Sequence, residues 1–132
     1  MHLSCIIVDD SEDFLTSAKS RLESQGVSVI GLASSCAEAL NLVDSLNPGV
    51  ALVDVQLGDE DGIELARRLT STHSSIPVVL ISLREQDELK ELIEGSGAAG
   101  FLRKQVLGAQ AIEDLVSEWR RKNVNSNPHH TT

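Results

Sequence analysis

Four short apolar runs, each ending in polar residues, constrain the fold of this chain more than any other feature. The runs are CIIVDD, ending at Asp9 and Asp10; VALVD, ending at Asp54; PVVLIS, ending at Ser82; and GFLRK, ending at Lys104. Short apolar runs between helical or turn-like segments are typical of buried parallel strands. Because the carboxyl ends of such strands share one edge of a sheet, we expect these polar side chains to converge there.

Helical patterns alternate with the apolar runs, which predicts an α/β fold. Right-handed crossovers place helices on both faces of such a parallel sheet. The sequence predicts strands over 6–9, 27–33, 50–55, 77–82 and 101–103, helices over 11–25, 35–46, 63–73, 85–94 and 111–119, and a polar loop over 58–62. Ser35 and Glu38 match a capping box at the start of the second helix.

Composition favours one packed domain. The chain has 132 residues, of which 41% are apolar and 23% charged, so a substantial core is expected. We expect the domain over 1–122 and a disordered tail, or the start of a linker, over 123–132. The formal net charge of −9 argues against direct contact of this domain with nucleic acid phosphates.

The same sequence favours a cytoplasmic location. No apolar stretch approaches the roughly 18 residues that a membrane span requires. Cys5 and Cys36 belong to no zinc-binding motif. Two such thiols are typical of a reducing compartment, and we expect no contact with a membrane.

The three strand-end aspartates predict a divalent cation site. Like charges a few ångströms apart repel, so Asp9, Asp10 and Asp54 need a cation to remain ionised together. Magnesium, or manganese, takes carboxylate, water and phosphate oxygens as ligands. The alternative is three solvated loop carboxylates, with Asp10 capping the first helix. Lys104 and Ser82 favour the functional interpretation, because a lysine after a buried strand needs a carboxylate and a serine hydroxyl can donate to a bound anion.

Four segments together resemble the receiver domain of bacterial two-component response regulators. They are IIVDDSEDF, ALVDVQLGDEDGIEL, VVLIS and GAAGFLRK, and the resemblance covers residues 2–122. It implies a flavodoxin-like (βα)5 three-layer sandwich whose parallel sheet has the strand order 2-1-3-4-5.

The resemblance also implies a role for each site residue. Asp54 is the phosphoacceptor, and Ser82 and Lys104 contact the phosphoryl oxygens. Ser82 and Phe101 are the switch residues, with Phe101 turning inward after Ser82 is drawn to the phosphoryl group. The implied ligands of Mg²⁺ are Asp9, Asp10, Asp54 and the backbone carbonyl of Gln56.

A receiver is a signalling switch rather than an enzyme. The resemblance implies that a phosphohistidine on a histidine kinase or a phosphotransfer protein is the donor. It implies transfer and autodephosphorylation that the domain itself catalyses. It also implies a possible homodimer through the fourth helix, fifth strand and fifth helix.

Other functions stay open at this stage. The chain is either a free-standing regulator or relay intermediate, or the receiver of a DNA-binding response regulator. A metal-dependent phosphatase with an aspartyl-phosphate intermediate is disfavoured because Gln56 stands where its second acid is expected. A flavodoxin-like cofactor binder is disfavoured because an acidic segment, rather than a phosphate-binding loop, follows the first strand.

Three positions depart from the commonest receiver sequence. Gly58 replaces a proline after the acceptor, which predicts a more mobile loop. Gln105 replaces the proline after Lys104, and a cis peptide bond before a non-proline residue costs about 2.5–4 kcal/mol, so the cis geometry is not expected. Leu83 replaces a small residue and is expected to slow loss of the phosphoryl group or to restrict the donor.

Overall fold

A central parallel sheet organises the chain, of which the computed structural model describes residues 2–84 and 89–125. Its strands are β1 (Ser4–Val8), β2 (Ser28–Ala33), β3 (Val50–Asp54), β6 (Val78–Ser82) and β7 (Gly100–Arg103). They lie in the order β2-β1-β3-β6-β7, and every pairing between them is parallel. Counted along the chain, these strands have the order 2-1-3-4-5. The predicted fold class is therefore confirmed.

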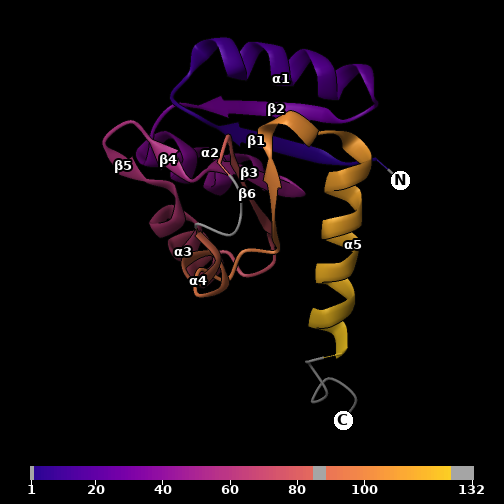
Figure 1. The fold of residues 1–132 in the computed structure, drawn as a ribbon. Coiled ribbons are helices and arrows are strands. Elements are labelled where there is room, and N and C mark those ends of the chain that lie inside the picture. The colour runs from indigo at the N-terminus through magenta and orange to yellow at the C-terminus, as the bar shows by residue number, and fades with distance from the viewer. Residues whose placement is uncertain (1, 85–88, 126–132) are drawn as a thin grey trace.

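Helices cover both faces of this sheet (Figure 1). They are α1 (Glu12–Ser24), α2 (Cys36–Leu46), α3 (Gly62–Thr72), α4 (Lys90–Glu94) and α5 (Ala109–Asn125), with a short 3-10 helix, η2 (Lys104–Val106). Alternate residues of β1 face opposite layers: Ile6 and Val8 pack toward α2 and α3, whereas Cys5 and Ile7 pack toward α1 and α5. The result is a three-layer sandwich in which β1 is buried from Cys5 to Val8.

Short polar side chains set the starts of the helices. Ser11 caps α1 by accepting a hydrogen bond from the backbone N–H of Phe14. Asp10 therefore does not cap this helix. At α2, Ser35 accepts from the N–H of Glu38 as predicted, but the Glu38 carboxylate accepts from the N–H of Ser34 rather than completing the capping box on Ser35.

The polar loop predicted over 58–62 is wrong in part. β4 (Gln56–Leu57) and β5 (Glu60–Asp61) form a small antiparallel hairpin that leads into α3. Gly58 has a φ of 60°, a conformation that glycine adopts without strain, and this allows the tight reversal. Asp61 then caps α3 through the N–H groups of Ile63 and Glu64.

Two other segments differ from their predicted limits. Of the helix predicted over 85–94, residues 85–88 lie outside the described residues, and α4 begins at Lys90. α5 begins at Ala109 and continues to Asn125, beyond the predicted boundary at 122, while 126–132 lie outside the described residues. Among the residues that are described, no helix has both the length and the apolar character needed to cross a bilayer.

Gly62 provides a test of how closely α3 approaches the end of β3. Its N–H donates to the Val55 carbonyl at 3.0 Å, and a Cβ at this position would overlap the backbone carbonyl of Asp54. Gly62→Ala is therefore expected to lower the free energy of unfolding by about 2–3 kcal/mol, as measured by urea denaturation. The control is Gly95→Ala, whose Cβ would make only ordinary contacts. Equal losses from the two substitutions would contradict this close approach.

Candidate functional site

Three aspartates gather at the carboxyl edge of the sheet. Asp9 and Asp10 follow β1, Asp54 ends β3, and these two strands are hydrogen-bonded neighbours. One carboxylate oxygen from each residue lies within 4.8 Å of the other two. Asp9 and Asp54 are buried, whereas Asp10 is exposed. The convergence predicted from the strand ends is thus present in the structure.

Lys104 links the two buried carboxylates. It follows β7, and its Nζ donates to Asp54 Oδ2 at 2.9 Å while lying 2.6 Å from Asp9 Oδ2. The same ammonium lies over the ring of Phe14, 4.3 Å from its centroid, where a cation–π attraction is expected. One cation therefore balances part of the negative charge of Asp9 and Asp54.

Burial shifts the pKa values of this pair. Burial raises the pKa of Asp54 to about 6, although hydrogen bonds from the Gln56 N–H and from Lys104 oppose the rise. Burial lowers the pKa of Lys104, but its contacts with Asp9 and Asp54 outweigh that effect and raise it overall. The lysine is therefore held as a cation beside a carboxylate that is costly to keep charged.

Asp9 has an oxygen that the protein leaves without a hydrogen bond. Its Oδ1 accepts from the N–H of Ser11 at 2.8 Å. Its Oδ2 is buried and, among the described residues, makes an ion pair with the Lys104 ammonium at 2.6 Å but no assigned hydrogen bond. A buried carboxylate oxygen of this kind is normally satisfied by another group. Together with oxygens from Asp10 and Asp54, it forms a donor set that suits Mg²⁺ or Mn²⁺.

The other predicted site residues are Ser82, Gln56 and Phe101, and each has its own set of contacts. Ser82 ends β6 beside β3 and is buried, but its Oγ accepts a hydrogen bond from the N–H of Arg84 at 3.0 Å. The N–H of Gln56 donates to Asp54 Oδ1 at 3.1 Å; a role for its carbonyl remains a prediction. Phe101 is half-buried within β7 and packs against the core layer on the α3 side.

The positions that depart from the commonest receiver sequence are also placed. The Lys104–Gln105 peptide bond is trans, as expected for a non-proline residue. Leu83 is 67% exposed and, with Phe14 and Lys104, lines a cavity of about 200 Å³ beside the acidic cluster.

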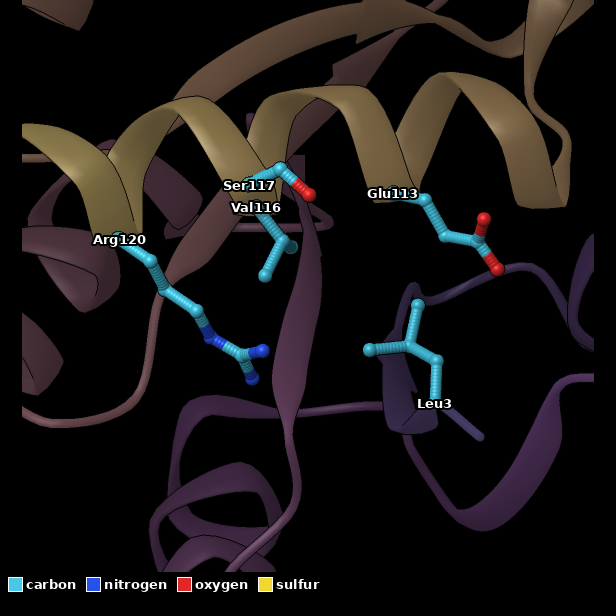
Figure 2. Close-up of a pocket in the computed structure, with 5 residues that line it drawn as sticks. All are labelled: Leu3, Glu113, Val116, Ser117 and Arg120. Atoms are coloured by element: carbon cyan, nitrogen blue, oxygen red, sulfur yellow. The ribbon is translucent and has the colours of Figure 1, made fainter. Parts of the chain in front are cut away.

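Figure 2 shows a second cavity, which plays no part in this cluster. Its volume is about 100 Å³ and it lies between α5 and the residue that precedes β1. It is lined by Leu3, Glu113, Val116, Ser117 and Arg120. Because Leu3 precedes β1 whereas Asp9 follows it, the cavity is at the opposite end of the sheet from the aspartates.

Some residues around the site were not identified from the sequence. Phe14 falls within the helix predicted over 11–25, and its ring lies under the Lys104 ammonium. Arg21 and Gln25 contact the segment after β7, through hydrogen bonds to the backbone of Leu107 and Ala109. These partners are more than eighty positions apart in the chain, so no local pattern could reveal them.

Comparison with known proteins gives a consistent result. The family model described as the response regulator receiver domain matches residues 5–117. Response regulator GacA of Pseudomonas viridiflava is 32% identical over 112 residues, which cover 83% of this chain and 52% of the relative. Response regulator MprA of Mycolicibacterium vanbaalenii is 32% identical over 122 residues, covering 91% and 50%. The chain thus spans about half the length of the curated relatives it matches.

A solved structure agrees with the fold. The signal receiver domain of a modulated diguanylate cyclase from Desulfovibrio desulfuricans superimposes with a TM-score of 0.78 and 27% identity. The match covers 92% of this chain and 99% of that domain.

Lys104→Met tests the charge balance of the site. Without the ammonium, Asp9 and Asp54 stay buried with no compensating cation from β7. We expect the free energy of unfolding to fall by about 3 kcal/mol, measured by urea denaturation at pH 7 in chelator-treated buffer. Lys19→Met is the control, because Lys19 pairs with Glu23 at the surface and should cost under about 0.5 kcal/mol. Similar costs for the two variants would refute the proposed balance.

Proposed function

The chain belongs to the response regulator receiver domain family, and on that premise we propose that it is a signalling switch that accepts a phosphoryl group on Asp54. The observation that most supports this proposal is the contact of the Lys104 ammonium with both Asp54 and Asp9 at the carboxyl edge of the sheet. In a parallel α/β sheet this edge is where ligands bind.

The proposed transfer requires little covalent chemistry from the protein. An oxygen of the Asp54 carboxylate forms a bond to phosphorus as the bond from phosphorus to the donor's histidine nitrogen breaks. Hydrogen bonds from the Gln56 N–H and from Lys104 hold the carboxylate in one orientation. The Lys104 ammonium is also placed to neutralise charge on the incoming phosphoryl oxygens.

We propose Asp9, Asp10, Asp54 and the backbone carbonyl of Gln56 as ligands of Mg²⁺ or Mn²⁺. The convergence of carboxylate oxygens from Asp9, Asp10 and Asp54 within 4.8 Å of one another supports this assignment. When bound, the metal supplies charge neutralisation for the carboxylates and the phosphoryl group. The protein residues hold the acceptor carboxylate of Asp54 in one orientation and so exclude other orientations of it.

The switch is proposed to begin at Ser82. This side chain lies at the end of β6, next to the strand that ends in Asp54. A hydroxyl that accepts a hydrogen bond, here from the Arg84 N–H, still has its own proton to donate to a phosphoryl oxygen. Movement of Ser82 toward Asp54 would change the packing available to Phe101, which is half-buried on the neighbouring strand.

The wider biological setting follows from the same proposal. The donor is a phosphohistidine on a histidine kinase or phosphotransfer protein, and the domain acts as a phosphoprotein switch rather than as an enzyme with an external substrate. A homodimer would use α4, β7 and α5. We propose a cytoplasmic location, which the free Cys5 and Cys36 favour.

One alternative has specific support. The chain spans about half of the response regulators that it matches. This observation favours a receiver that belongs to a longer regulator, including one with a DNA-binding output domain. In that case the receiver itself would make no direct contact with nucleic acid, in agreement with its net charge of −9.

Phosphorylation from a small-molecule donor tests the function directly. We expect acetyl phosphate to add one phosphoryl group to the wild-type protein only when Mg²⁺ or Mn²⁺ is present, as measured by intact-mass spectrometry. Asp54→Asn should abolish the modification, because an amide is not a nucleophile for phosphorus. Asp59→Asn is the control, since Asp59 is an exposed aspartate outside the acidic cluster. Modification that persists in Asp54→Asn would show that another residue is the acceptor.

Leu83→Ala tests whether the exposed leucine limits access to the phosphoryl group. Leu83 adjoins the cavity beside Lys104, so its removal should admit water and hasten loss of the phosphoryl group roughly two- to fivefold, an effect of about 0.4–1 kcal/mol on the barrier. The measurement is the decay of phosphorylated protein after removal of the donor. Leu92→Ala removes another exposed leucine, on α4, and should leave the decay unchanged. An unaltered lifetime in Leu83→Ala would contradict the shielding role.

A further inference from the structure

We propose that α1 is a brace that positions Lys104, with Arg21 and Gln25 as positioning residues for the phosphoryl-transfer site. This inference rests on the proposed function, because the role of Lys104 in transfer is part of it. Arg21 and Gln25 touch neither the aspartates nor the ammonium, and they would act through the backbone that follows Lys104.

The contacts run in the same order along α1 and along the segment after β7. Phe14 lies under the Lys104 ammonium, with 4.3 Å from its ring centroid to Nζ. Arg21 Nη1 donates to the Leu107 carbonyl at 3.2 Å.

Gln25, the C-cap residue that follows α1, completes the series. Its Oε1 accepts from the N–H of Ala109 at 2.6 Å. Residues 14, 21 and 25 are separated by seven and four positions, which places them on one stripe of a helix. One face of α1 therefore follows the chain from Lys104 to the start of α5.

Few other contacts among the described residues hold residues 105–108 in place. Gln105 and Val106 are exposed, and a cavity of about 200 Å³ lies between α1 and the segment. Phe14 and Arg21 line one side of the cavity and Lys104 lines the other. Side-chain packing across an open cavity cannot locate a backbone closely.

Leu107 connects the hydrogen bond from α1 to the hydrophobic core. Its side chain is buried, its carbonyl accepts from Arg21, and its N–H donates to the Lys104 carbonyl at 3.4 Å. Residues 104–109 include no proline that would restrict the backbone. Pairing of Arg103 with Ser82 in the sheet fixes the backbone before Lys104. The hydrogen bonds from α1 restrain the backbone after it and so add to the control of its direction.

A competing explanation is that attraction to Asp9 and Asp54 alone positions the ammonium. Both carboxylates are within ion-pair distance of Nζ. If that attraction were sufficient, breaking the hydrogen bond from Arg21 would leave the lysine where it is. The two explanations therefore differ in what they predict for an Arg21 variant.

The experiment compares Arg21→Met with Lys19→Met. Both remove one positive charge from α1, but Lys19 pairs only with Glu23 on the same helix in the contacts described. The first readout is the ¹³C and ¹H shift of the Lys104 ε-methylene in lysine-labelled protein, which the Phe14 ring current displaces. We expect Arg21→Met to lose this displacement and Lys19→Met to retain it. Arg21→Lys should restore it, because an ammonium can also donate to the Leu107 carbonyl.

The second readout is phosphorylation of Asp54 by acetyl phosphate. A misplaced cation should lower the maximal rate roughly tenfold with little change in the half-saturating donor concentration. Lys19→Met should match the wild type, and Arg21→Lys should recover most of the rate. If Arg21→Met unfolds, the same comparison is made at Gln25, whose side chain accepts from the Ala109 N–H. Gln25→Ala removes this hydrogen bond, whereas Gln25→Glu keeps an oxygen that can accept it.

The outcomes separate the two proposals. A wild-type protein that is not phosphorylated would refute the proposed function, while the lysine shift would still report on the brace. A different result would overturn the brace alone: the wild type is phosphorylated, but Arg21→Met behaves like Lys19→Met in both readouts.

Discussion

The contact of one ammonium with two buried carboxylates is the interaction on which the rest of this site depends. Asp9 and Asp54 lie at the ends of neighbouring strands and are both buried, and the charge of Asp9 adds to burial in raising the pKa of Asp54. Lys104 offsets that cost because β7, although two strands away from β3, ends at the same edge. Strand order and charge balance are therefore parts of one constraint: the sheet must bring β1, β3 and β7 to a common edge for the carboxylates to remain stable.

Much of this arrangement could be predicted from the sequence, for a physical reason. Parallel strands end at one edge, so a polar residue after each apolar run is enough to indicate convergence without knowledge of any contact. The hairpin β4–β5 was missed because its strands are only two residues long and depend on Gly58 at a φ of 60°. The partners of Arg21 and Gln25 were missed because their hydrogen bonds join segments that only the completed sheet brings together.

Helix α1 connects the acidic and basic halves of the site. Ser11, its cap, donates its N–H to Asp9 Oδ1, so the start of the helix helps to hold the first aspartate. Phe14 lies under the Lys104 ammonium one turn later. The same helix thus contacts both partners of the Asp9–Lys104 ion pair, and it contacts the segment after β7 as well. A displacement of α1 would change the aspartate and the lysine together rather than one at a time.

The short contact between Lys104 and Asp9 also sets a condition for the proposed phosphoryl transfer. The ammonium lies 2.6 Å from Asp9 Oδ2 and 2.9 Å from Asp54 Oδ2. To neutralise incoming phosphoryl oxygens, Lys104 must give up part of its contact with these carboxylates. Asp9 is fully buried, so its charge must then be balanced by a different cation, because an uncompensated buried carboxylate is strongly unfavourable. In the proposed transfer the two requirements would be coupled: Lys104 would become available to the phosphoryl group if a second cation balanced the charge of Asp9.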